Sequence, residues 1–439
     1  MKTTLRISLA ALLLLAAADG YGQKTWTLRD CIDYARENNI QVQAARITRE
    51  GTDIDLLTAK ARKLPSLNFS STQSYAHQKS ENPGGGFDSR GRYSGSYSLN
   101  AEFTLYNGGK LNQSVRQQEI LGDVREAEVE TAANDIEVAV IQGYLQVLYD
   151  RESLTQAQQT VESSAAQLTQ SQALLEAGSI SVSDHAQIEA QYSSDLYNLT
   201  AAENALSLAR LQLKQLLELG IDDRMEIYYP ELDSSQIMAT LPPLHEVYRT
   251  SLGVMPQIAG SLKSIEASLV GEKIARADRI PTLSVSAAAG TGNFSQTGYN
   301  FFNQLNNQFN QSAGLRISIP IFNNRQTRSA IEKAQLSTHS ARLDYTRVEK
   351  DLLQTVETLY QDALSARSSY VAASDKLRAA SLSYDLVSRQ FDVGMKTPVD
   401  LLTEKNNFLS ARQQQLQTKY KAILSIQLLN FYQNIPVEL

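Results

Sequence analysis

The side chains most often used for catalysis or metal binding are scattered along this chain. The histidines lie at His77, His185, His245 and His339, with no spacing that would bring two of them to one metal ion. No glycine-rich phosphate loop opens a helix, and no serine, histidine and acidic residue stand in the order of a catalytic triad. We therefore expect no catalytic site, no metal site and no cofactor.

Two acidic side chains stand out because they recur in matched surroundings. Asp184 follows Gly178 in the segment AGSISVSD, and Asp400 follows Gly394 in VGMKTPVD. A carboxylate in the first turn of a helix is stabilised by the positive end of the helix dipole. One interpretation is therefore that both aspartates only stabilise the helices in which they lie. Whether they also have a functional role depends on the elements around them.

The composition limits the partners that the chain can bind. Charged residues make up 20% of the 439 residues, and the formal net charge is -6. No basic stripe is present to neutralise phosphates, which argues against nucleic acid. Proline is scarce, with 10 residues, so the composition favours long uninterrupted helices over a loop-rich fold.

Residues 1–22 have the organisation of a secretory signal peptide. Lys2 and Arg6 precede an apolar run over residues 7–18, which is too short to span a bilayer. Small residues at Gly20 and Gly22 then provide a cleavage site. A membrane anchor is the less favoured alternative.

The rest of the chain offers neither a lipid anchor nor a membrane helix. Cys31, the single cysteine, is not the first residue after the cleavage site, so we expect no lipoprotein anchor and no internal disulfide. No long apolar run follows the signal, so any insertion into a membrane must use strands.

The mature chain repeats at an offset of 216 residues. Pro65 in KLPSLNFS corresponds to Pro281 in RIPTLSVS, and Gly178 corresponds to Gly394. The same offset joins three further pairs, namely Leu28 with Leu244, Tyr106 with Phe322 and Asp184 with Asp400. We therefore expect a first structural repeat over residues 23–227, a connector over 228–243 and a second repeat over 244–439.

Each repeat should contain a first helix, two strands and two long helices. The first helix is expected over Thr27–Lys63 and again over Pro243–Arg279, ending before a proline each time. We expect strands at about residues 65–79, 92–106, 281–290 and 312–322, and long helices at about residues 110–177, 183–219, 326–393 and 398–431. Leucines seven residues apart, as in Leu402, Leu409 and Leu416, predict coiled-coil packing of the long helices.

The expected strands alternate between apolar and polar residues. In RYSGSYSLNAEFTLY, the positions from Tyr93 to Leu105 that bear odd numbers are aromatic, aliphatic or glycine, whereas the even positions are mostly serine, asparagine and threonine. Any half-buried sheet alternates in this way. The same pattern is typical of a membrane barrel that lines a watery lumen.

Four strands are too few to close a barrel. Lipid offers no hydrogen bonds to a free sheet edge, and the smallest known barrels need about eight strands. If the strands cross a membrane, several copies of the chain must therefore share one barrel. Three copies would supply twelve strands.

The chain resembles the TolC-like outer-membrane efflux protein family over its whole mature length. The turn sequences AGSISVSD and VGMKTPVD and the strand-end sequences LYNGGK and IFNNRQ carry the resemblance, together with the duplication. The resemblance implies a mainly α fold with membrane β structure, in which a homotrimer forms a 12-stranded β-barrel, four strands per chain, continuous with a long periplasmic α-helical barrel. It also implies a passive exit duct in outer-membrane lipid for tripartite efflux or type I secretion. A periplasmic adaptor and an inner-membrane transporter would be its partners.

The resemblance further implies roles for residues at the two turns. Gly178 and Gly394 would mark the periplasmic tip, where the adaptor docks and the channel is gated. Lys396 matches a basic position that ties neighbouring hairpins together in the closed channel, and Asp184 matches its acidic partner. Asp400 matches one position of an acidic ring around the entrance.

Two positions depart from the family pattern. Thr403 stands at the second position of the acidic ring, which weakens the ring. Phe391 stands where the family can place a tyrosine that forms a hydrogen bond, so that latch is lost. We expect Phe391 to belong to the gate region without this bond.

Two other kinds of protein compete with a channel. A periplasmic coiled-coil adaptor or structural protein would explain the long helices and the signal, but it needs neither the strand pairs nor the duplication. An exported enzyme would need convergent acids or a metal site, which this sequence does not provide.

Overall fold

The computed structural model describes residues 25–81, 84–230, 232, 237–295, 298–437 and 439. The expected signal peptide, residues 1–22, lies outside these residues. The described residues divide into two compact units: unit 1 takes those of Met1–Arg46, Val129–Pro256 and Glu349–Leu439, and unit 2 takes those of Ile47–Glu128 and Gln257–Val348. Each unit contains segments of both sequence repeats. The first long helix of each repeat begins in unit 2 and ends in unit 1.

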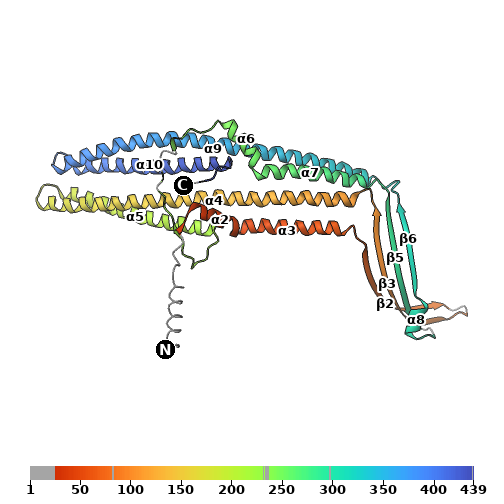
Figure 1. The fold of residues 1–439 in the computed structure, drawn as a ribbon. Helices are drawn as coiled ribbons and strands as arrows, with labels where there is room; N and C mark the ends of the chain where they lie inside the picture. Colours follow the sequence, from red (N-terminus) through yellow and green to blue (C-terminus); the bar gives the residue numbers. More distant parts are fainter. Residues whose placement is uncertain (1–24, 82–83, 231, 233–236, 296–297, 438) are drawn as a thin grey trace, which may run out of the picture. The chain divides into compact units, whose positions relative to one another are not determined.

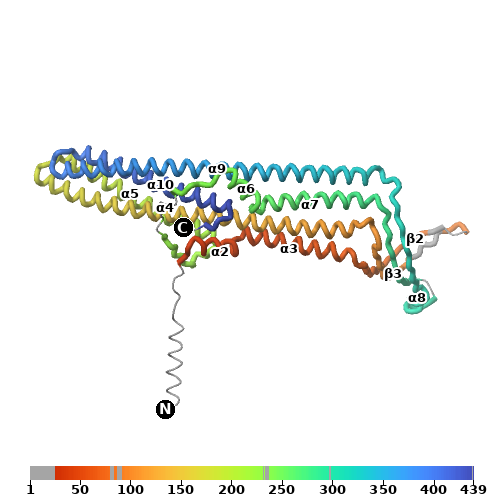
Figure 2. The backbone as a smooth tube through the Cα atoms, turned by 45° about the horizontal axis from the view of Figure 1, so that its top comes forward, coloured from red at the N-terminus to blue at the C-terminus, as the bar shows by residue number. Residues whose placement is uncertain are grey.

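Unit 1 contains two long helical hairpins. The first hairpin is made by α4 (Lys110–Glu176) and α5 (Val182–Leu216), and the second by α9 (Gln326–Asp392) and α10 (Pro398–Tyr432). Both hairpin turns lie at the same end of unit 1, drawn in yellow and in blue (Figures 1 and 2). The unit is completed by α2 (Leu28–Asn38), α6 (Leu244–Val254) and a parallel pair of short strands, β1 (Thr25–Trp26) and β4 (Glu226–Ile227).

Each expected first helix is two helices in the structure. Between α2 and α3 (Ile40–Ala61), Asn39 is extended, with φ −65° and ψ 134°. Between α6 and α7 (Pro256–Ala277), Met255 is extended with φ −75° and ψ 122°. Met255 leaves the helical region because proline follows it. The expectation of one continuous helix at the start of each repeat was wrong.

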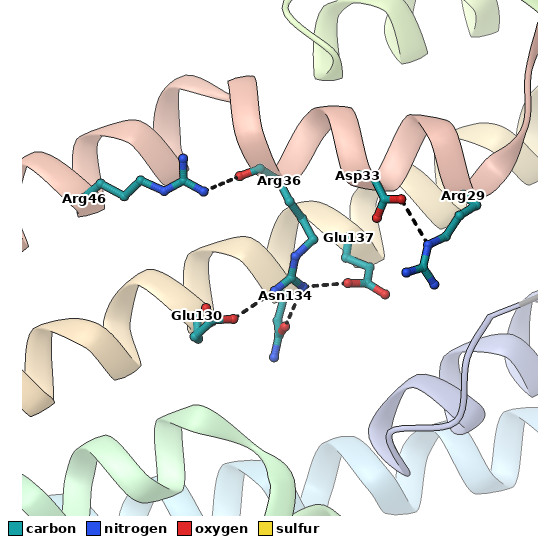
Figure 3. A network of polar contacts seen from close by, with 7 residues as sticks. All are labelled: Arg29, Asp33, Arg36, Arg46, Glu130, Asn134 and Glu137. Atoms are coloured by element: carbon teal, nitrogen blue, oxygen red, sulfur yellow. Dashed lines mark hydrogen bonds and ion pairs between the residues drawn. The ribbon is translucent and has the colours of Figure 1, made fainter.

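A group of polar side chains holds α2 against α4 in unit 1 (Figure 3). The guanidinium of Arg36 donates to Glu137 Oε2 at 2.7 Å, to Glu130 Oε2 at 2.8 Å and to Asn134 Oδ1 at 3.2 Å. The Arg46 side chain donates to the carbonyl oxygen of Arg36 at 3.0 Å. Because the arginine and its partners are partly exposed, each ion pair contributes at most about 1 kcal/mol. We assign this group a structural role.

Unit 2 carries an antiparallel sheet with the strand order β2-β3-β5-β6. Its strands are β2 (Ser66–Glu81), β3 (Phe87–Tyr106), β5 (Thr282–Phe294) and β6 (Asn310–Ser318). Within the described residues, β2 and β6 each have one strand neighbour, so the sheet has two open edges.

The two faces of this sheet differ as the alternation predicts. Phe69 and Ala289 lie opposite Leu99 on its two sides, which puts apolar residues of neighbouring strands on one face. On the other face the Ser70 and Ser98 hydroxyls are 2.7 Å apart and hydrogen bonded. The apolar face is uncovered in a single chain, where the Phe69 side chain is 65% exposed.

The second hairpin of the sheet differs from its expected form. Strand β6 ends at Ser318 rather than at about residue 322, consistent with Pro320, which cannot donate to a strand ladder. A short helix, α8 (Phe301–Asn307), lies between the strands expected at about residues 281–290 and 312–322. Among the described residues, no helix carries an apolar stretch long enough to cross a membrane.

Candidate gate at the hairpin turns

Both hairpin turns use the same backbone motif. Gly178 and Gly394 have φ of 73° and 76°, in the left-handed region that favours glycine. The Gly178 N–H donates to the Leu175 carbonyl at 2.9 Å, and the next N–H donates to the Leu174 carbonyl at 2.8 Å. Two bonds of the same kind, at 2.9 and 2.8 Å, surround Gly394. These are Schellman motifs, which satisfy the last carbonyls of α4 and α9.

The residues after each turn form a capping box. The hydroxyls of Ser181 and Thr397 accept from the backbone N–H of Asp184 and Asp400, at 3.1 and 3.2 Å. In return, each carboxylate accepts from the N–H of its cap residue at 3.1 Å. The backbone N–H and then the hydroxyl of Thr397 hold the pKa of Asp400 below its ordinary value. Both aspartates therefore have a local structural role, whatever they do in addition.

Lys396 and Asp184 are not brought together within one chain. Lys396 is exposed, and no carboxylate among the described residues lies within ion-pair distance of its ammonium group. Asp184 accepts both hydrogen bonds of its cap through Oδ2. Thr403 donates to the carbonyl of Val399 at 2.7 Å, within its own helix.

Phe391 lies in a small apolar core beneath the turns. It is 6% exposed and clusters with Ile188, at 2%, and Leu401, at 1%. These three residues come from α9, α5 and α10, so the cluster joins the two hairpins. The aromatic ring therefore stabilises this end of unit 1 by packing rather than by a polar latch.

A buried ion pair that the sequence reasoning missed also joins the hairpins. Lys405 Nζ on α10 lies 3.0 Å from Asp195 Oδ2 on α5, and the two side chains are 3% and 1% exposed. Gln191 donates to the other carboxylate oxygen at 2.9 Å. The Lys405 ammonium also donates to Gln167 Oε1 of α4 at 3.3 Å, and the Gln167 amide donates to the Tyr384 hydroxyl of α9 at 2.9 Å. One polar network therefore connects all four long helices.

The described residues provide no alternative site for metal chemistry. No group of three or more histidine, cysteine, aspartate or glutamate side chains in this part of the chain is arranged to hold a metal ion. His185 instead pairs through Nδ1 with the Ser171 hydroxyl at 2.9 Å, next to the first turn.

Comparison with known proteins identifies the family to which a chain of this architecture belongs. The sequence model of the family described as "Outer membrane efflux protein" matches residues 31–218 and 247–431, one match in each repeat. The chain belongs to the outer membrane efflux protein family. The sequence resemblance to this family is thereby confirmed.

Individual relatives agree with the family match. Outer membrane protein TolC of Escherichia coli (strain K12) is 23% identical over 411 residues, which cover 89% of this chain and 78% of TolC. The fold resembles that of CusC, with a TM-score of 0.79 at 17% identity and 95% of both chains covered. It also resembles VceC from Vibrio cholerae, with a TM-score of 0.77 at 15% identity over 94% of this chain and 97% of VceC. The predicted fold class, mainly α with strands, is confirmed.

Family membership fixes the location and the class of activity. This efflux protein is an outer-membrane channel component with a large periplasmic portion. Its family consists of channels rather than enzymes, and the periplasmic-adaptor alternative is not favoured.

Proposed function

We propose that three copies of this efflux protein close one 12-stranded barrel in the outer membrane. The observation that carries the proposal is the sheet with two open edges, formed by β2 and β6. In lipid an unpaired backbone group loses the hydrogen bonds that water would give, at several kcal/mol for each group. Pairing β6 of one copy with β2 of the next removes every open edge.

The two faces of the sheet support this arrangement. The exposed apolar face, which includes Leu67 at 70%, Leu315 at 63% and Ile317 at 63%, would meet lipid. The opposite face, which is rich in hydroxyl groups, would line the lumen. A barrel of this kind conducts polar solutes because its interior stays hydrated.

The helices of unit 2 also leave apolar side chains for neighbouring copies. Ile47 and Ile54, seven residues apart on α3, are 68% and 63% exposed. Leu336 and Leu343, seven residues apart on α9, are 68% and 60% exposed. Seven-residue spacing is the spacing of a coiled-coil seam, so these stripes would pack against helices of another copy.

In this assembly the chain acts as a passive exit duct. An inner-membrane transporter and a periplasmic adaptor would deliver substrate, as expected for tripartite efflux or type I secretion. The protein itself would use no cofactor and catalyse no reaction, and the connector over residues 228–243 would join its two structural repeats.

The two hairpin turns would form the gate and the adaptor-docking end. Lys396 would bind Asp184 of a neighbouring hairpin from another copy, since no carboxylate among the described residues of its own chain lies within ion-pair distance of its ammonium group. An exposed ion pair contributes only about 0–1 kcal/mol, so a docking adaptor could overcome three of them. The three Asp400 carboxylates would favour cations at the entrance, while Gly178, Gly394 and Phe391 would shape the turns that carry these charges.

Planar-bilayer recording tests this gate. We expect discrete current steps from the purified protein, and a higher single-channel conductance in Lys396→Ala and in Asp184→Ala, because either change removes the bridge. Lys376→Ala is the control: Lys376 lies on the same hairpin and donates to Gln414 Oε1 at 2.9 Å. If both gate variants have the same conductance as the unchanged protein, Lys396 and Asp184 are not part of the gate.

A further inference from the structure

The two hairpins of the sheet end in chemically different segments. Residues 291–311, which comprise the end of β5, α8 and the start of β6, contain no Asp, Glu, Lys or Arg, although charged residues make up 20% of the chain. This segment contains five aromatic residues and many amides instead. The end of the β2–β3 hairpin, residues 79–92, carries charges of both signs. An uncharged, aromatic-rich segment is suited to a less polar environment than a charged hairpin end.

The structure positions the uncharged segment at a defined level of the sheet. Strand β3 pairs with β5 as far as Ser94 opposite Phe294, and the Ser295 N–H then donates to the Tyr93 carbonyl at 2.7 Å. Beyond this point the strand residues of β3 pair with β2. Helix α8 follows β5 near this level (Figure 1). Pairing of β5 with β6 ends at Gly290, and pairing between β5 and β3 ends at Phe294, so among the described residues only β2 and β3 continue beyond it. Tyr93 and its cross-strand partner Tyr75, which are 43% and 71% exposed, lie close to the same level.

Helix α8 is fixed to β5 by partly buried hydrogen bonds. Gln304 is 8% exposed; its Oε1 accepts from the Phe294 N–H at 2.7 Å, and its amide donates to the Tyr299 carbonyl at 2.9 Å. The Thr291 hydroxyl donates to the Leu305 carbonyl at 2.5 Å. Thr291 lies opposite Tyr97 and two residues beyond Ala289, on the apolar face of the sheet. The helix is therefore a continuation of that face rather than a loose loop.

Four of the five aromatic rings of this segment are exposed, whereas the ring of Phe294 lies under the guanidinium of Arg92, 5.1 Å from its centroid. Phe302 is 77% exposed and Phe301 is 44% exposed, and their rings meet edge to face with centroids 5.5 Å apart. Tyr299 and Phe309, on either side of α8, are 63% and 55% exposed. Exposed aromatic side chains gathered in this way mark an interaction surface.

We propose that α8 is an interfacial anchor whose aromatic side chains insert into the outer leaflet, at the boundary between hydrocarbon and headgroups. The proposal rests on the proposed function, in which the apolar face of the sheet meets lipid. Aromatic rings are enriched at this boundary, and neutral amides can hydrogen-bond to headgroups there. Because the segment has no charge, the anchor does not depend on anionic lipid or on salt.

Spin labelling of Phe302→Cys tests the anchor. The native Cys31 is fully buried, so the introduced thiol is the one that reacts. In phosphatidylcholine vesicles we expect the label to collide readily with oxygen and rarely with a water-soluble nickel chelate. Adding phosphatidylglycerol or salt should leave this ratio unchanged. Met395→Cys, at a hairpin turn and 74% exposed, is the matched control and should show the opposite ratio.

Two results would overturn the anchor. One is a label at residue 302 as accessible to the nickel chelate as the label at residue 395. The other is dipolar broadening between labels of different copies, which would mean that α8 meets another chain. Bilayer conductance of the same labelled protein separates the two proposals. If the labelled protein gives current steps and also either of these two results, the anchor is wrong and the channel stands. If the labelled protein neither inserts into the bilayer nor conducts, the proposed channel itself is wrong.

Discussion

The two helical hairpins of unit 1 share a backbone design but not a set of interior side chains. Their turns use the same glycine conformation and the same capping box, 216 residues apart. The buried ion pair, by contrast, breaks the repeat. Lys405 corresponds to the exposed Glu189, and Asp195 corresponds to Ala411, which is fully buried. The two repeats have therefore kept the same turn geometry since the duplication. The residues that form the contact between α5 and α10, by contrast, differ between the repeats.

The largest effect should come from breaking that specific contact. Lys405→Met leaves the Asp195 carboxylate buried without its cation, which we expect to destabilise the hairpins by about 3–5 kcal/mol. Lys263→Met is the control. Lys263 lies 3.1 Å from Asp123, a comparable distance, but both side chains are about half exposed, so solvent screens the pair and its loss should change the stability far less. Thermal melting of the helical circular dichroism signal measures both changes.

A double variant separates pairing from packing at the same position. Lys405→Met with Asp195→Leu removes both charges and should recover most of the lost stability, because an apolar pair of similar volume can replace a buried ion pair. Equal losses in the single and the double variant would mean that the site depends on side-chain shape rather than on charge.

The shared turn geometry should give a smaller and matched effect. Gly178→Ala and Gly394→Ala should each cost about 1–2 kcal/mol, because alanine must adopt the left-handed conformation, although the added Cβ would meet no atom of the described residues beyond its chain neighbours within 4 Å. Gly122→Ala, inside α4 and also without a close neighbour, should instead be neutral or stabilising by up to about 1 kcal/mol. If Gly178→Ala and Gly394→Ala lower the stability by very different amounts, the two turns are not equivalent as the duplication implies. The same melting experiment provides the comparison.

These contrasts mark how far the sequence could be used for prediction. Helix α4 ends at Glu176 and α9 at Asp392, each one residue from the expected end, since glycine acts locally and leaves a sequence signal. The break at Asn39 depends on tertiary contact, because its side chain donates to the Leu216 carbonyl at 3.1 Å. Lys405 lies three residues after Leu402 in the coiled-coil pattern, so a charge in the seam was a detectable signal. Its partner Asp195 could not be identified without knowing which helices meet.

The smallest effect concerns Asp400 and the entrance. Its pKa is lowered in the folded chain, so capping by the charged carboxylate is fully present above the unfolded value of about 3.8 and is lost as pH falls through the lower folded pKa. In the proposed ring, cation selectivity should therefore persist below the ordinary pKa of an aspartate and be lost as pH falls through the lowered pKa of Asp400. Asp400→Asn should weaken selectivity wherever the Asp400 carboxylate is charged, and should make no difference at a pH where that carboxylate is protonated. Reversal potentials in a salt gradient measure these differences, and equal selectivity in Asp400→Asn and the unchanged protein would exclude the ring.

The number of chains in the detergent-solubilised protein tests the central claim most directly. The sheet of one chain has two open edges, at β2 and β6, and the account requires other copies to pair with them. Native mass spectrometry of the mature protein should give the mass of three copies, which separate only when the strands unfold. A stable single-chain species that retains its β structure in detergent would contradict the account.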